Sequence, residues 1–486
     1  EWKVYRKDNL NWESFFVYEI WLNKLMDSKL VSSDDTICAI CTPDGVGSLA
    51  VIRISGPRAL DITKEIFKPK NTKTSFKPNM TNLGNIYYKE KLIDQGIGIY
   101  FKSPNSLTGQ DVVELQTHGG YVVPKMVLKA LLVAGARLAE PGEFSFRSFL
   151  NGKIDLLEAE GIADLISSQS EAAANYSTKN ISGEITKKFN NLRDLGINLL
   201  AELEARVDFP EDEISEIDKN KILEEYNQIK DECSSIFESY DKGRLIMKGL
   251  RVLILGEPNV GKSTLLNAIL NEERSIVTNI PGTTRDIVEA QIDFRGHRLS
   301  FSDTAGQRVS KDIVETAGIQ KAKDKINYSD AVLIVTDKSD SLSDLEKVFS
   351  FVPREKIYFV LNKSDLISER KLLIDELKLK KMRFIEISAK ESTNIRNLLI
   401  SLLTFFVNRN SVDSDESVLT TERQVNLVKD GIKAIERSRL LFANSDHIEL
   451  VTIELRFFLE VISKITGEIH NEDIYDILFS KFCIGK

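Results

Sequence analysis

The arrangement of hydrophobic and polar residues changes several times along the chain. From Asp34 to about Leu150, short segments with alternating apolar residues, such as SLAVIRISG and DQGIGIYF, are separated by glycine and proline turns. The segment VPKMVLKALLVAGA has helical periodicity instead. This mixture of strand and helix patterns predicts an α+β domain, which we place at residues 34–152.

From about Asp155 to Lys248 the chain is rich in Glu, Lys, Ala and Leu, and its apolar residues recur at helical spacing. This spacing places apolar side chains on one face of a helix. It predicts long amphipathic helices over residues 153–248, one of them broken at Phe209-Pro210. The apolar positions that carry this prediction are Ile185, Phe189, Leu192, Leu199, Leu203 and Val207.

From Leu250 to about Leu403 strand patterns alternate with helical ones. The strand segments are LRVLILG, RLSFSDTAG, DAVLIVTD, KIYFVLNKSD and RFIEISAK. Repeated alternation of this kind predicts a doubly wound parallel sheet, with its site at the carboxyl ends of the strands. We assign residues 249–405 to this domain.

After Phe405 the polar linker NRNSVDSDES leads into another helical region, residues 406–486. Two stretches of long helix can complete one bundle even when a domain is inserted between them. The predicted fold class is therefore multidomain α/β: a doubly wound nucleotide-binding domain inserted in an all-α helical domain and preceded by the α+β domain. Residues 1–33 are interpreted as an extension of unknown role that lacks the features of a signal peptide.

Composition narrows the class of protein. The chain has 65 Lys and Arg against 73 Asp and Glu, a net charge of −8, which argues against a protein that coats nucleic acid by bulk electrostatics. Any RNA contact is then local or shared with a partner. There is no apolar run of the roughly 20 residues that a membrane span requires, so we expect a cytoplasmic protein.

Four cysteines are too few and too scattered for a disulfide framework, which suits a reducing compartment. Cys38 and Cys41 form a C-x-x-C pair, but no second pair or histidine cluster accompanies them. Their setting, DTICAICTPDG, alternates like a strand. We therefore interpret them as packed strand cysteines rather than zinc ligands or a redox pair.

The segment GEPNVGKST, Gly256 to Thr264, has the P-loop spacing G-x-x-x-x-G-K-[ST] between a strand pattern and the helical pattern STLLNAIL. Lys262 is predicted to reach the β- and γ-phosphates of a nucleotide, and Ser263 to bind Mg²⁺. Backbone amides at the start of the helix would cradle phosphate oxygens. These amides belong to Asn259, Val260, Gly261, Lys262, Ser263 and Thr264.

Three further motifs follow strands in the same domain. Asp303 begins D-T-A-G and supplies an acidic group near Mg²⁺, while Gly306 offers an amide to the γ-phosphate. The Asp365 carboxylate can accept hydrogen bonds from N1 and N2 of guanine, a donor pair that adenine lacks, so the predicted nucleotide is GTP. The motif residues are Asp303, Thr304, Ala305 and Gly306; Asn362, Lys363, Ser364 and Asp365; and Ser388, Ala389 and Lys390, which would complete the base pocket.

Three features stand beside these motifs: Asn259 in the P-loop, Arg308 after D-T-A-G, and the terminal segment FCIGK. Together with the motifs they resemble the tRNA modification GTPase MnmE family, also called TrmE, and this resemblance does not rest on them alone. It also rests on TPDGVGSLAVIRISG, SLTGQDVVELQTHGG and EPGEFSFRSFLNGKIDLLEAEGIADLI near the front, and it covers about Asp34 to Lys486. A loop of the family type, TNIPGTTRD, contains Thr278, Asn279, Ile280, Pro281, Gly282, Thr283 and Thr284.

The resemblance implies a homodimer formed through the N-terminal domain, and a 5-formyl-tetrahydrofolate or related one-carbon folate bound there. It implies the flavoprotein MnmG as a partner in a hetero-oligomer. The two would install a carboxymethylaminomethyl or aminomethyl group on the wobble uridine of tRNA, with GTP hydrolysis driving the cycle. Carried over by motif, the folate contacts are Arg53, Glu114, Lys153 and Lys486.

The resemblance also implies two cations. K⁺ would be held by Asn259 together with Thr278, Ile280 and Thr283, and Thr284 would join Ser263 on Mg²⁺. A cation beside the phosphates can stabilise transition-state charge where other GTPases insert an arginine. The alternative interpretation of Asn259 is an ordinary turn residue.

The catalytic assignment has two candidates. The resemblance implies that Glu315, twelve residues after Asp303, orients the attacking water. Gln307 stands directly after D-T-A-G, however, where Ras-like enzymes place the glutamine with this role. We favour Glu315, because the rest of the potassium-type loop is intact, and we count Arg308 in the candidate catalytic set.

Two questions stay open at this point. Cys483, in the terminal F-C-I-G-K, is either a catalytic thiol near the folate or a buried free cysteine. The alternative function is a GTPase switch for ribosome assembly of the Era or Der type. That alternative requires a KH-like domain or a second P-loop, and the sequence offers neither.

Overall fold

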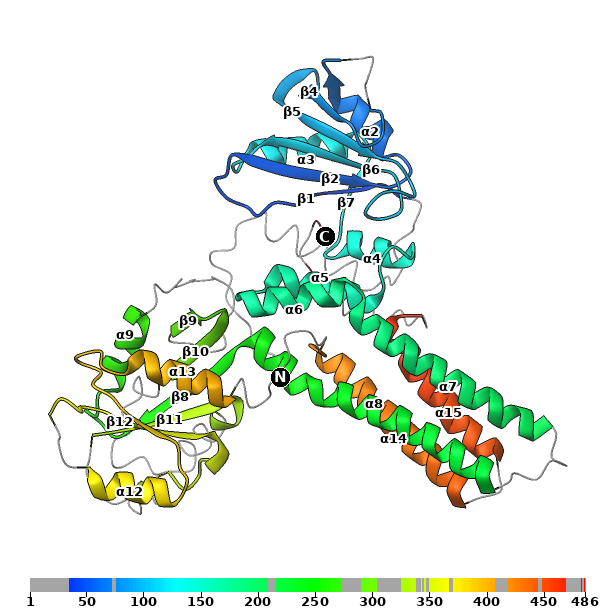
Figure 1. Cartoon of the computed structure of the whole chain (residues 1–486). Helices are drawn as coiled ribbons and strands as arrows, with labels where there is room; N and C mark the ends of the chain where they lie inside the picture. Colours follow the sequence, from blue (N-terminus) through cyan, green and yellow to red (C-terminus); the bar gives the residue numbers. More distant parts are fainter. Residues whose placement is uncertain are drawn as a thin grey trace, which may run out of the picture. The chain divides into compact units, whose positions relative to one another are not determined.

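The structure is a computed structural model of the 486-residue chain. Its described residues are 35–71, 76–208, 216–272, 290–303, 325–337, 342, 345–346, 349–366, 370–406, 418–444, 448–468, 482 and 485. They form two compact units, the first of residues 1–154 with 471–486 and the second of residues 155–470. Each is described by itself below (Figure 1).

The first unit contains a seven-stranded sheet in the order β3-β4-β5-β6-β2-β1-β7. Its pairs are antiparallel except for β1 with β7, which run parallel. The strands are β1 (Ile37–Ile40), β2 (Leu49–Ser55), β3 (Phe67–Pro69), β4 (Thr81–Tyr88), β5 (Lys91–Phe101), β6 (Val112–His118) and β7 (Arg137–Leu138).

Helices α2 (Ala59–Ile66) and α3 (Val123–Val133) bury their apolar faces in one core with the sheet. Alternation along β1 divides its side chains between two cores. Cys38 points into the core with α2 and α3, whereas Ile37 and Ala39 pack with Phe144 of α4 (Glu143–Leu150). The predicted α+β domain and its helix at VPKMVLKALLVAGA are thereby confirmed.

The helical part of the second unit is built from both sides of the inserted domain. Its helices are α5 (Leu156–Ser167), α6 (Glu171–Ile181), α7 (Glu184–Asp208), α8 (Glu216–Lys248), α14 (Glu422–Asn444) and α15 (Ile448–Thr466). One apolar core joins Phe189 of α7, Tyr226 of α8, Ala434 of α14 and Phe458 of α15. The predicted bundle is therefore confirmed, and Figure 1 shows α7 and α8 beside α15 and α14.

The inserted domain has a six-stranded sheet in the order β13-β12-β11-β8-β10-β9. All neighbours are parallel except β10 and β9, so the predicted parallel sheet carries an antiparallel edge strand. The strands are β8 (Leu250–Gly256), β9 (Ala290–Phe294), β10 (His297–Asp303), β11 (Ala331–Thr336), β12 (Ile357–Leu361) and β13 (Phe384–Glu386).

Both faces of this sheet are covered, as a doubly wound fold requires. Val252 and Ile254 of β8 pack in the core with α9 (Lys262–Glu272) and α13 (Ile395–Phe406). Leu253 and Leu255 point the other way, into the core with α12 (Lys371–Leu379). Among the described residues, no helix is both long enough and apolar enough to cross a bilayer.

Candidate functional site

The predicted nucleotide motifs begin at one edge of the parallel sheet. Gly256, at the end of β8, is in register with Val335 of β11, and Asp303, at the end of β10, is in register with Ile254 of β8. The β12 strand ends at Leu361, just before the N-K-S-D motif. Because these carboxyl ends adjoin, three motifs that lie far apart in sequence start side by side.

The P-loop has the tight backbone that phosphate cradles need. Asn259 and Gly261 have positive φ angles of 66° and 97°, and α9 begins at Lys262. A Cβ atom on Gly261 would lie 2.3 Å from Nδ2 of Asn362, so only glycine fits there. Lys262 Nζ donates to the carbonyl oxygens of Gly256 and Glu257 at 3.0 and 2.8 Å, which holds its charge over the loop.

The remaining P-loop residues differ in their exposure to solvent. The Val260 side chain is buried in the core of the domain. Ser263 and Thr264, in the first turn of α9, are exposed to solvent. The free amides and positive dipole end of a helix start favour an anion. The residues present therefore fit a phosphate group with an accompanying cation.

Asn362 joins three of the predicted motifs. Its side chain is almost fully buried, and Nδ2 donates to the carbonyl oxygen of Val260 at 2.8 Å. Its Oδ1 accepts a hydrogen bond from the backbone amide of Ala389 at 2.9 Å. One amide side chain thus connects the P-loop, the N-K-S-D motif and the S-A-K motif.

The residues after Asn362 are held from both sides. Lys363, with a positive φ of 60°, donates from Nζ to the Asn259 carbonyl at 3.1 Å and forms an ion pair with Asp337. Ser388 Oγ donates to Oδ1 of Asp365 at 2.6 Å. This hydrogen bond holds the pKa of the exposed Asp365 carboxyl below its usual range, which keeps it charged.

The other two residues of these motifs, Ser364 and Lys390, are more exposed than Asn362. The amide of Ser364 donates to the Ile387 carbonyl at 3.0 Å, and Lys390 is exposed beside Glu391. Sequence reasoning missed two contributors, Asp337 and Arg370. Asp337 ends the segment DAVLIVTD, directly after β11, and could have been found from that position. Arg370 lies outside the motifs, and its local sequence carries no signal.

Several predicted site residues lie outside the described part of the chain. They are Thr278, Asn279, Ile280, Pro281, Gly282, Thr283, Thr284, Thr304, Ala305, Gly306, Gln307, Arg308, Glu315, Cys483 and Lys486. Asp303 is described only as the last residue of β10.

A second candidate site lies in the first unit. Arg53 of β2 and Glu114 of β6 are in register, and their Nε and Oε1 atoms are 2.8 Å apart. Arg53 Nη1 also donates to the Gly485 carbonyl at 3.3 Å, and its guanidinium lies 5.6 Å from the centre of the Phe144 ring. Gly485 is thus bonded to Arg53, one of the predicted folate contacts, which also pairs with Glu114.

Lys153, the third predicted folate contact that the structure describes, donates instead to the Pro104 carbonyl at 3.0 Å. Cys41 was not predicted at this site, yet its Sγ donates to the Gly485 carbonyl at 3.1 Å. Cys38 is fully buried in β1, and burial raises the pKa of its thiol to about 12. Cys38 and Cys41 therefore lie in different surroundings, one in the core and the other beside the terminal segment.

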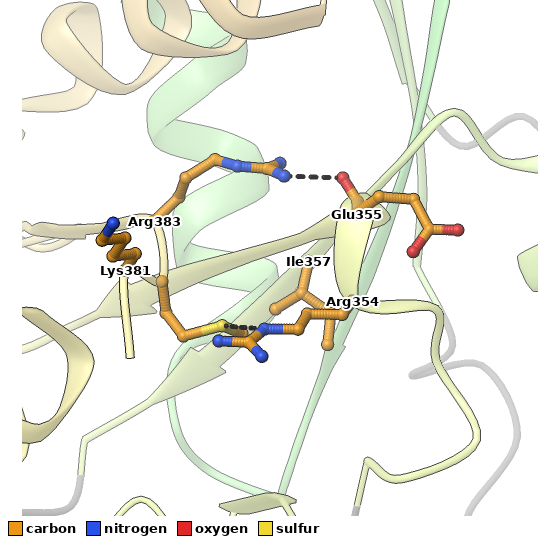
Figure 2. A pocket seen from close by; sticks show the side chains of 6 residues that line it. Arg354, Glu355, Ile357, Lys381 and Arg383 are labelled. Carbon is orange, nitrogen blue, oxygen red and sulfur yellow. Dashed lines mark hydrogen bonds between the residues drawn. The ribbon is translucent and has the colours of Figure 1, made fainter. Parts of the chain in front are cut away.

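A hollow at the amino-terminal ends of the parallel strands contains none of the predicted site residues (Figure 2). It lies where β12 and β13 begin, next to the short helix η1 (Arg354–Lys356). Arg383 Nη2 donates to the Glu355 carbonyl at 2.8 Å, and Arg354 Nε donates to Sδ of Met382 at 3.1 Å. The guanidinium groups of Arg383 and Arg354 thus both donate hydrogen bonds to other residues that line the hollow.

The doubly wound sheet, the P-loop and the Asp365 carboxylate define a P-loop GTPase domain. Comparison with known families makes the assignment particular. A family model described as "MnmE helical domain" matches residues 156–483, and one described as "GTP-binding protein TrmE N-terminus" matches residues 36–153. The chain belongs to the family of tRNA modification GTPases called MnmE, as its motifs predicted.

Curated relatives agree with this assignment over nearly their whole length. The tRNA modification GTPase MnmE of Acetivibrio thermocellus is 38% identical over 456 residues, covering 93% of this chain and 99% of the relative. The MnmE proteins of Desulforamulus reducens and Flavobacterium johnsoniae are 37% and 36% identical, covering 93% of this chain and 100% of each relative.

Among solved structures, the G-domain of FeoB from Methanococcus jannaschii is 21% identical, covering 32% of this chain and 94% of that one. Its TM-score of 0.24 is too low to bear on the fold. The family match, in contrast, spans the α+β domain and the helical bundle as well. It therefore sets aside the alternative of an Era- or Der-type assembly factor.

Proposed function

We propose that this protein is a K⁺-stimulated, Mg²⁺-dependent GTP hydrolase that takes part in modification of the wobble uridine of tRNA. It would act in the cytoplasm as a homodimer with the flavoprotein MnmG, and the product would carry a carboxymethylaminomethyl or aminomethyl group at C5. The single observation that carries the nucleotide assignment is the Asn362 side chain bonded to both Val260 and Ala389. The relatives named tRNA modification GTPase support the role in tRNA modification.

GTP binding would use the groups already gathered at the sheet edge. Lys262 would leave the two carbonyls it now bonds and pair with the β- and γ-phosphates. Ser263 and Thr284 would hold Mg²⁺, which neutralises phosphate charge when bound. Asp365 would accept hydrogen bonds from N1 and N2 of guanine, and its lowered pKa favours the charged acceptor.

Hydrolysis would depend on the loop residues that the resemblance identified. Asn259, Thr278, Ile280 and Thr283 would hold K⁺ beside the phosphates. The Lys363 contact to the Asn259 carbonyl supports this role for Asn259, since it restrains the residue's backbone. Glu315 would orient the attacking water, with Gln307 as the competing candidate and Arg308 nearby in sequence.

The folate assignment concerns the first unit. Arg53 and Glu114 would contact the one-carbon tetrahydrofolate, together with Lys153 and Lys486. The bond from Arg53 to the Gly485 carbonyl supports this grouping, since Lys486 is the next residue along the chain. The folate would supply the one-carbon unit, and Cys483 is the candidate thiol for that chemistry.

The test is GTP hydrolysis by the full chain in K⁺ and in Na⁺ at equal ionic strength, repeated for Glu315→Ala and Gln307→Ala. We expect hydrolysis to be at least about tenfold faster in K⁺, because one additional contact to the charge of the transition state has an effect of at least this size. Glu315→Ala should abolish the stimulation while GDP affinity is unchanged. Equal rates in both salts, with Gln307→Ala the more damaging change, would indicate a Ras-like mechanism instead.

The tRNA part is tested separately, by adding unmodified tRNA, MnmG, a one-carbon folate, GTP and an amine donor, either glycine or ammonium, to the protein. Mass spectrometry of the digested tRNA should then show a new group on the wobble uridine. The matched control replaces GTP with GDP, which should leave the uridine unmodified. Modification that proceeds equally with GDP would contradict the proposed role of hydrolysis.

A further inference from the structure

A buried arginine lies beneath the guanine-recognition loop. Arg370 immediately precedes α12, and its side chain is 3% exposed. Its Nη2 donates to the carbonyl oxygen of Asn362 and, at 3.4 Å, to that of Asp337. One guanidinium therefore connects the residues that directly follow β12 and β11.

This charge is only partly compensated. Among the described residues, Nε and Nη1 of Arg370 are buried without a hydrogen-bond partner. Burial lowers the pKa of the group, although the charges of Glu386 and Asp337 oppose that shift. A buried cation with incomplete hydrogen bonding contributes little net stability, because desolvation offsets its attractions. The position of Arg370 therefore points to a role in the geometry of the adjoining loops.

The two carbonyls that Arg370 bonds belong to residues whose side chains face the nucleotide site. Asn362 bonds Val260 and Ala389 through its amide, and Asp337 pairs with Lys363 through its carboxylate. Both residues are thus held from two directions, by side-chain contacts on one side and by Arg370 on the other. Rotation of the Asn362 peptide would also move Lys363, whose φ of 60° leaves it little freedom.

We propose that Arg370 is a positioning residue for guanine recognition. By bonding the carbonyls of Asn362 and Asp337, it fixes the loop from Asn362 to Asp365 so that the Asp365 carboxylate faces N1 and N2 of the base. This inference rests on the proposed guanine-nucleotide site. It predicts that loss of Arg370 reduces discrimination between bases, as well as affinity.

Inosine diphosphate is the informative probe, because its base lacks the N2 amine and can donate only one hydrogen bond to Asp365. The ratio of GDP affinity to IDP affinity therefore reports how well the carboxylate is aimed at the pair of donors. A loss of overall stability would weaken the binding of GDP and of IDP equally and leave the ratio of their affinities unchanged. Misplacement of Asp365 would lower the ratio.

The experiment titrates the full chain with GDP and IDP and compares Arg370→Met, Arg370→Lys and Arg383→Met. Arg383 is the matched control, since its guanidinium also bonds a backbone carbonyl, that of Glu355, at the amino-terminal ends of the parallel strands of the same sheet (Figure 2). We expect Arg370→Met to lower GDP affinity about tenfold, the usual loss for a hydrogen bond from a charged group, and the GDP:IDP ratio about threefold. Arg383→Met should leave the ratio unchanged.

Arg370→Lys keeps the charge but cannot bond two carbonyls with one planar group, so an intermediate ratio is expected. If Arg370→Met fails to fold, the ratio for Arg370→Lys decides alone. A wild-type ratio in every folded Arg370 variant would overturn the inference. Asp365→Asn serves as the reference: if it leaves the ratio unchanged, the proposed guanine site itself fails.

Discussion

Asn362 and Ala389 lie 27 positions apart, yet Oδ1 of the first accepts a hydrogen bond from the backbone amide of the second at 2.9 Å. Nδ2 of the same Asn362 side chain donates to the Val260 carbonyl. The P-loop and both base-recognition motifs therefore share one buried polar group. A change in any of the three is expected to be felt by the others, since a buried network acts as a unit.

Asn362→Ala should weaken GDP binding by at least about tenfold, because it leaves the Ala389 amide and the Val260 carbonyl buried without their partner. Titration with a fluorescent GDP analogue measures this. The control is Asn82→Ala in the first unit, where an equally buried amide bonds the carbonyls of Met80 and Gly98. Asn82→Ala should lower the melting temperature of its unit with GDP affinity unchanged; similar GDP affinities in both variants would contradict the network.

Ser388→Ala should make GDP binding more sensitive to acid. The Ser388 hydroxyl lowers the pKa of Asp365, so the wild-type carboxylate stays charged, and binds guanine, below the usual Asp pKa of about 3.9. Without the hydroxyl the pKa rises, and affinity should fall at a higher pH as acid is added. GDP titrations between about pH 3.5 and 7, with circular dichroism to confirm folding, measure the shift.

Ser364→Ala is the control for that experiment. Ser364 belongs to the same N-K-S-D motif, but among the described contacts its hydroxyl does not bond Asp365. Its pH profile should match that of the wild type. If Ser388→Ala also matches the wild type, the hydrogen bond does not set the charge of Asp365.

Gly485→Ala should weaken binding of 5-formyl-tetrahydrofolate. Gly485 has a φ of 98°, and a Cβ there would lie 2.7 Å from the Ile40 carbonyl oxygen, so the terminal segment would have to move away from Arg53. Gly120→Ala is the matched control, because its φ is 95° but no atom lies within 4 Å of its Cβ. Calorimetry should show at least fivefold weaker folate binding for Gly485→Ala only, a loss of roughly 1 kcal/mol.

Cys38 and Cys233 should resist alkylation in the folded protein. Burial raises the pKa of both thiols to about 12, so at pH 8 only about one in ten thousand is the reactive thiolate. Iodoacetamide labelling followed by peptide mass spectrometry should find both unmodified until urea is added. Rapid labelling of native Cys38 would contradict its interpretation as a packed strand cysteine and would favour redox chemistry.

The secondary-structure elements and the chemical class could be predicted from the amino-acid sequence. The helical spacing from Ile185 to Leu203 marks side chains that are all buried in the bundle core, because burial follows the period of a helix. The P-loop was recognisable because its residues are adjacent: Gly261, Lys262 and Ser263 stand together at one helix start. Patterns formed by residues that are close in the sequence can be recognised without knowledge of the fold.

Contacts between groups far apart in the sequence became visible only in the folded chain. Arg53 and Cys41 bond the Gly485 carbonyl across 432 and 444 positions, and Arg370 bonds the residue after β11 although it precedes α12. The antiparallel pairing of β9 at the sheet edge was equally absent from the periodicity. Such contacts depend on strand order and on how chain segments close on one another, and no local spacing of residue types encodes either.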